Sequence, residues 1–188
     1  NFFFFSGFGT YEVKVDTTSL PFNVTCPLSF NYTSVLATGN AYDSLANFGL
    51  ECKPGFDLIA QSITPNANFR PGAFRTVKIN AGENSFLYGT QCNATFGGTV
   101  QLILNGPVSF YASVANAITP SIINGDTLTW IVSNFSLTDP NKDYNFISEV
   151  STSATIGDTL CFDLIINPSV GDSNPANNIY SACFAVVN

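Results

Sequence analysis

The sequence contains no histidine and no methionine, and charged side chains make up only 10% of its 188 residues. Without histidine the chain lacks the commonest general base and the commonest zinc ligand, so its own residues cannot build a Ser-His-Asp nucleophile or a histidine-bound zinc. Because methionine is absent, we expect a mature product or a fragment of a longer protein. No window approaches the ~20 apolar residues of a membrane-spanning helix, so membrane insertion is not expected.

The charge of the chain also limits its possible partners. The net charge is −7, and the six basic residues are scattered along the chain, which argues against nucleic acid because phosphate binding needs clustered Lys and Arg. With so few charges the surface must be covered by Asn, Ser, Thr and Gly. This composition is common in extracellular β-proteins, whose turns use Asn, Gly, Asp and Pro and whose strands use Val, Ile, Thr and Phe.

Hydrophobic alternation predicts short strands separated by turn residues, and no helix signals are present. The break Lys53-Pro54-Gly55 divides them into two domains, 1–53 and 54–188. We therefore predict an all-β chain of tandem β-sandwich domains, the first of them incomplete and the second an immunoglobulin-like sandwich. The predicted strands are residues 11–16, 22–26, 32–36, 45–50, 56–63, 73–80, 99–104, 108–113, 127–133, 144–150, 158–166 and 179–187.

Several motifs in the second domain carry a resemblance. FDL at 56–58, RPG at 70–72, GDTLTW at 125–130, ATIGDTLC at 154–161 and GDSNPANN at 171–178 resemble an Ig-like repeat domain of large Bacteroidetes surface proteins. The resemblance implies a long multidomain chain exported by the type IX secretion system.

A second resemblance covers the first segment. GTYEV at 9–13, DTTSLP at 16–21 and TCP at 25–27 are similar to the end of a prealbumin-like domain of the Gram-positive adhesin B-repeat type. It implies stalk or adhesin architecture and carries no catalytic residues to this chain.

Five cysteines without metal-type spacing indicate an oxidising compartment and hence export. Cys161 and Cys183 lie on the non-apolar side of their predicted strands, so a cross-strand disulfide on the outer face is one interpretation. Cys26 and Cys52 are the second candidate pair, which leaves Cys92 over. The alternative for all five is that they are small buried apolar residues.

A catalytic or metal site has little support. No cofactor is expected, and a pair of carboxylates for glycoside hydrolysis is the only enzymatic alternative, but most Asp residues fall in turns. Asp139, Asn141 and Asp143 resemble the start of a calcium loop. The pattern then fails, because Tyr144 stands where the turn glycine is needed, and a type I turn explains the segment as well.

Sugar could be attached to the chain or bound by it. Thr17, Ser44, Thr127 and Thr159 each follow an Asp in a pattern like the Bacteroidetes O-glycosylation motif, although Asp-Thr pairs also simply open strands. Asn23, Asn31, Asn93 and Asn134 match the eukaryotic acceptor pattern. The single Trp130 alternates with Leu128 and Val132, which favours a core position over a sugar-stacking platform.

Three functions are compatible with these features. The first is a non-catalytic stalk or adhesive domain pair of a secreted cell-surface protein, with neighbouring domains, like subunits or surface glycans as partners. The second is a filament subunit joined by strand addition, for which the aromatic run Phe2–Phe5 is a candidate contact. The third is a carbohydrate-binding module.

Overall fold

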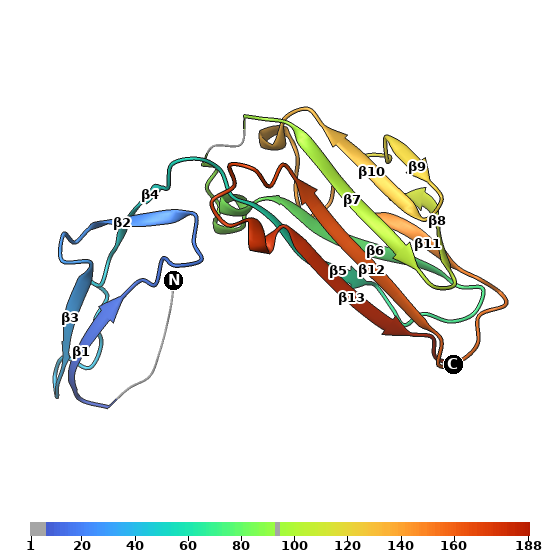
Figure 1. Cartoon of the computed structure of the whole chain (residues 1–188). Helices are drawn as coiled ribbons and strands as arrows, with labels where there is room; N and C mark the ends of the chain where they lie inside the picture. Colours follow the sequence, from blue (N-terminus) through green and yellow to red (C-terminus); the bar gives the residue numbers. More distant parts are fainter. Residues whose placement is uncertain (1–6, 93–94) are drawn as a thin grey trace. The chain divides into compact units, whose positions relative to one another are not determined.

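The computed structural model describes residues 7–92 and 95–188, and the chain forms two compact units, residues 1–54 and 55–188 (Figure 1). The predicted break at Lys53-Pro54-Gly55 contains this boundary. The run Phe2–Phe5 and the acceptor Asn93 lie outside the described residues. The chain is nearly all-β with several antiparallel sheets, as the composition and alternation predicted.

The second unit is a sandwich of two antiparallel sheets. A five-stranded sheet has the order β13-β12-β7-β10-β9, and a four-stranded sheet has the order β5-β6-β11-β8. The strands are β5 (Leu58–Pro65), β6 (Phe74–Glu83), β7 (Gly98–Asn105), β8 (Val108–Ser113), β9 (Ile122–Asn124), β10 (Thr127–Val132), β11 (Phe146–Val150), β12 (Thr159–Asn167) and β13 (Ile179–Ala185).

The core lies between these two sheets and follows the period of two in the sequence. In β12 the alternate side chains of Leu160, Phe162, Leu164 and Ile166 are fully buried, whereas the residues between them are half-buried. Trp130 is 1% exposed in the same core, and its ring packs edge-on against Tyr144 at 5.7 Å. Trp130 is therefore a core residue, as its alternation with Leu128 and Val132 predicted.

The strand neighbours β13-β12-β7 and β5-β6-β11 match the G-F-C and A-B-E neighbours of an immunoglobulin sandwich. The path between them differs, because β8 crosses to the four-stranded sheet directly after β7 and the chain then returns through β9 and β10. The strand β9 was not predicted, since its three residues are too short to show alternation. The described residues also contain three short 3-10 helices: η1 (Asn84–Tyr88), η2 (Phe135–Leu137) and η3 (Pro175–Asn177).

In its described residues, 7–54, the first unit forms two separate two-stranded sheets. Strand β1 (Gly9–Lys14) pairs with β3 (Asn31–Leu36), and β2 (Phe22–Cys26) pairs with β4 (Gly49–Cys52). The fourth strand was predicted at 45–50, but it begins later, at Gly49. The residues before it form a turn in which the Leu45 N–H donates a hydrogen bond to the Asp43 carboxylate. Phe22 is the only buried large apolar side chain among the described residues of this unit.

Candidate functional site

The two terminal strands of the second unit run side by side in the same direction. Parallel bridges join Phe56 to Asp172 and Phe69 to Val186, which bracket β5 and β13 at both ends. The chain therefore enters this unit at one end of β5 and leaves it at the other end, where Figure 1 places the C-terminus. Since β5 is eight residues long, the two ends are separated by about 27 Å of strand.

Hydrogen bonds close both ends of this seam between β5 and β13. At the first end the Ser173 N–H donates to the Phe56 carbonyl oxygen (2.9 Å), and at the second end the Val187 N–H donates to the Phe69 carbonyl oxygen (2.9 Å). Tension applied directly to the start of β5 and to the end of β13 would pull the two strands in opposite directions parallel to their axes. The bonds of the seam are then stretched together rather than opened one after another.

Aromatic packing reinforces the seam at its C-terminal end. The Phe69 ring lies 5.6 Å from Phe184 of β13 and 5.8 Å from Phe162 of β12, and Phe162 lies 5.9 Å from Phe184. Phe69 is 1% exposed although it stands in a turn segment outside any predicted strand. In the sequence, the only sign that this side chain is buried is that an aromatic residue stands among turn-forming residues, between Asn66 and Pro71.

The structure contains the disulfide between Cys161 and Cys183. These residues face each other across β12 and β13, with Cα atoms 4.1 Å apart. Their side chains lie on the outer face of the sheet because the alternate positions of β12 fill the core. The bond ties the last strand of the unit covalently to its neighbour.

The expected pairing of Cys26 with Cys52 is wrong. Cys26 is a free, exposed thiol, whereas Cys52 and Cys92 are both disulfide-bonded. Cys92, which was expected to be left over, is therefore oxidised. Sequence spacing could not decide this, since any two cysteines that the fold brings together can pair. Two disulfides indicate that the chain matures outside a reducing cytosol.

The outer face of the five-stranded sheet is mostly uncharged. Register places Gln101 between Ile165 and Thr129 in one row across the sheet. In the next row the Asp163 carboxylate accepts hydrogen bonds from Asn105 (2.9 Å) and from the Ser181 hydroxyl (2.5 Å). This mixture of β-branched and neutral polar side chains suits contact with another uncharged surface.

A shallow depression of about 170 Å³ lies beside β10. Its lining includes Ile118, Ile131 and Leu137, while the Trp130 ring is buried and donates its Nε1–H to the Ile118 carbonyl oxygen (2.8 Å). Ligand pockets usually measure about 300–1,000 Å³. The indole face is not available as a platform for a sugar ring.

The predicted calcium segment satisfies its own polar groups. The Asp139 carboxylate pairs with Lys142 (2.9 Å) and accepts from the Asn141 N–H, and the Asp143 carboxylate accepts from the Asp139 N–H. The hydrogen bond from Lys142 is the main cause that lowers the pKa of Asp139. The geometry is that of a capped turn. Among residues 7–92 and 95–188, no three Asp, Glu, His or Cys side chains are grouped to hold a metal ion.

The four O-glycosylation candidates are all at the surface to some degree. Ser44 and Thr159 are exposed, and Thr17 and Thr127 are half-buried. Thr127 and Thr159 begin β10 and β12, so the Asp-Thr pairs before them also open strands. The structure thus permits modification at these positions without requiring it. In the described part of the chain, no helix is long and apolar enough to cross a membrane.

No protein-family model matches the chain, and no curated protein matches it either. The resemblance to Bacteroidetes surface domains therefore remains a prediction from the motifs quoted above.

Proposed function

We propose that this chain is a non-catalytic spacer of an exported cell-surface protein, in which the second unit transmits tension between neighbouring domains and presents an adhesive outer face. The observation that carries the proposal is the parallel seam between β5 and β13, with the chain entering and leaving at opposite ends. A domain used in tandem needs its two connections far apart, and one that is pulled needs them placed so that its strands shear.

Further features support the same function. The core is continuous and apolar, and the Cys161–Cys183 disulfide holds the exit strand. The outer face carries few charges, which suits contact with uncharged surfaces or with glycans. The motifs that resemble type IX-exported surface proteins support a location of the spacer outside the cell.

Single-molecule force spectroscopy on the full chain tests the proposal. All force samples of this experiment carry Cys52→Ser and Cys92→Ser, because the disulfide of these cysteines would shield β5 from tension. In one geometry the handles are attached at residues 54 and 188, so that tension shears the seam. In the matched geometry they are attached at residues 54 and 173, which lie at the same end of the seam, so that tension peels it. We expect a higher unfolding force in the first geometry, and an equal or lower force there would refute the proposal.

A second candidate rests on the first unit. Over residues 7–54 each of its two sheets has two strands, and isolated two-stranded sheets are marginally stable in water. A strand supplied by a like subunit would extend either sheet, which is the assembly expected of a filament. Electron microscopy of the native chain and of a chain lacking residues 1–9 tests this. Polymers that vanish on truncation support the filament, and separate particles in both samples refute it.

A further inference from the structure

A second disulfide brackets the first two strands of the second unit in the sequence. Of the five cysteines, Cys26 is free and Cys161 is bonded to Cys183, so the two other bonded cysteines, Cys52 and Cys92, are bonded to each other. The elements β5, β6 and η1 lie between these two positions in the chain. Because a disulfide is far stronger than the hydrogen bonds of a sheet, it shields residues 53–91 when the chain is pulled from residues before Cys52. The start of β5 then receives no load.

Tension that passes through this bond arrives at Cys92 and continues toward β7, which begins at Gly98. Just before the strand, the Phe96 ring packs against the rings of Phe56 (4.2 Å) and Phe135 (5.6 Å). The Phe96 carbonyl oxygen also accepts a hydrogen bond from the Phe135 N–H (3.0 Å). These contacts hold the approach to β7 in place, so the load enters the sheet at the start of β7.

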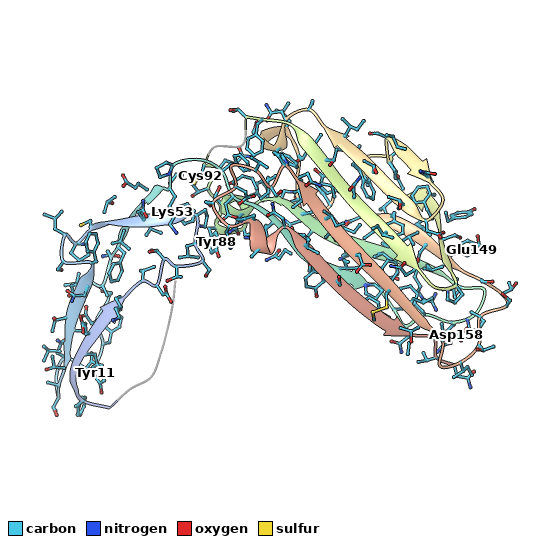
Figure 2. The ribbon with its side chains drawn as sticks, in the orientation of Figure 1. Tyr11, Lys53, Tyr88, Cys92, Glu149 and Asp158 are labelled. Carbon is cyan, nitrogen blue, oxygen red and sulfur yellow. A yellow bond between two sulfur atoms is a disulfide. The ribbon has the colours of Figure 1, made fainter. Side chains whose placement is uncertain are left out.

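The disulfide between Cys161 and Cys183 sets the point where the load leaves. Tension applied at the C-terminus reaches the last residues of β13 and passes at Cys183 through the two sulfurs to Cys161 of β12. Figure 2 shows this bond in yellow, toward the end of the sheet where Asp158 is labelled. The residues between the two cysteines are shielded in the same way as residues 53–91. The load therefore leaves the sheet from β12.

One antiparallel ladder connects the two points. At one end of the ladder between β7 and β12, Thr99 lies opposite Asn167. At the other end, Asn105 lies opposite Cys161. The load enters β7 at the first end and leaves β12 at the second, so it pulls the two strands in opposite directions parallel to their axes. The hydrogen bonds of the ladder are then loaded together.

This ladder lies inside the five-stranded sheet, between β13 and β10. The core-facing side chains along it are fully buried, namely Val100 and Leu102 of β7 and Phe162, Leu164 and Ile166 of β12. Sliding β7 along β12 breaks the ladder and drags these side chains past one another. The seam between β5 and β13 is bridged at its two ends. The ladder is therefore expected to resist a higher force than the seam.

We propose that the Cys52–Cys92 disulfide is a strap that diverts tension away from β5 and, together with the Cys161–Cys183 disulfide, onto the ladder between β7 and β12. The strap raises the force that the second unit withstands, while β5, β6 and η1 carry no load. This inference rests on the proposed function, because it concerns a unit that bears tension, and it changes the strands that the tension loads.

Force spectroscopy on the full chain tests the strap. The handles are attached at residues 51 and 188 through azide-bearing side chains, so that no cysteine is added, and reductant is left out. The chain with all five cysteines is compared with the variant that carries Cys52→Ser and Cys92→Ser. We expect a higher peak force in the chain with all five cysteines. It should also release about 130 Å less chain, because about 40 residue steps at about 3.4 Å each stay shielded.

A third sample separates a change of load path from stabilisation of the fold by the disulfide. It carries Cys52→Ser and has its handles at residues 92 and 188, so tension enters where the strap would deliver it although the strap is absent. Its peak force should equal that of the chain with all five cysteines. A peak force that stays at the lower value would show that the disulfide only stabilises the fold, and would overturn the proposal.

Two outcomes of the first comparison would also overturn the strap. Equal released lengths would show that Cys52 and Cys92 are not bonded, and a peak force no higher with all five cysteines would show that the ladder resists no better than the seam. The test of the proposed function compares shearing with peeling in chains without this bond. Its failure and the failure of the strap are therefore distinguishable.

Discussion

Replacing Cys161 and Cys183 together by serine removes the covalent tie between β12 and β13. Both sulfurs lie on the outer face, so the substitution opens no cavity in the core. The disulfide closes a loop with a sequence separation of 22, and loss of such a cross-link lowers the free energy of unfolding by about 3 kcal/mol through the greater entropy of the unfolded chain.

The same variant should lengthen the chain released by force. While the disulfide is intact, the residues between the two cysteines are shielded from tension, and the bond spans only 4.1 Å between Cα atoms. Without it, the 22 steps extend at about 3.4 Å each, so the released length grows by about 70 Å.

The assay is force spectroscopy with handles at residues 54 and 188, combined with urea unfolding of the same samples. All samples carry Cys52→Ser and Cys92→Ser, and the chain that keeps Cys161 and Cys183, without reductant, is the reference for both. An unchanged released length would show that the two sulfurs are not bonded in the protein. A released length that increases while the peak force in the shearing geometry stays near the reference value would locate the mechanical barrier in the seam between β5 and β13. If the peak force falls to that of the peeling geometry, the barrier resides in the disulfide instead of the seam.

Three other changes have defined outcomes. Trp130→Ala should lower the free energy of unfolding by about 3–5 kcal/mol because it empties a core site, whereas Ile131→Ala, at a neighbour that is 61% exposed, should change it by less than about 0.5 kcal/mol; similar losses in urea unfolding would contradict the core position. Iodoacetamide under native, non-reducing conditions should add one group per chain, and Cys26→Ser should take up none, so any other stoichiometry by mass spectrometry contradicts the thiol assignment. Hydrogen bonds from the Thr155 N–H and hydroxyl lower the pKa of Asp158 in the folded protein. The ionised carboxylate therefore stabilises the fold at pH values above its unfolded pKa of about 3.9. This contribution is lost as the pH falls through the lower pKa of the folded state. Asp158→Asn should therefore flatten the fall of the urea midpoint below about pH 4, and an unchanged acid limb would refute this.

Much of the fold was predictable because strand formation is a local property. The alternation in β12 identified its core face from neighbouring residues alone, and the same rule placed Trp130 inside and Cys161 outside. Turn residues marked most strand ends for the same reason. Strand β9 escaped because three residues hold too little alternation, and β4 was placed early because the turn at Asp43 uses residues that read as strand.

By itself, the sequence determined the all-β class, the break near Pro54, the inward and outward faces of the long strands, and the absence of histidine chemistry, because composition and period act over a few residues. Only the tertiary structure decided that β5 and β13 lie parallel, that Cys26 keeps its thiol while Cys52 is oxidised, and that β7 pairs with β12. Each of these depends on segments far apart in the chain meeting in one place, and packing of the whole core selects those meetings.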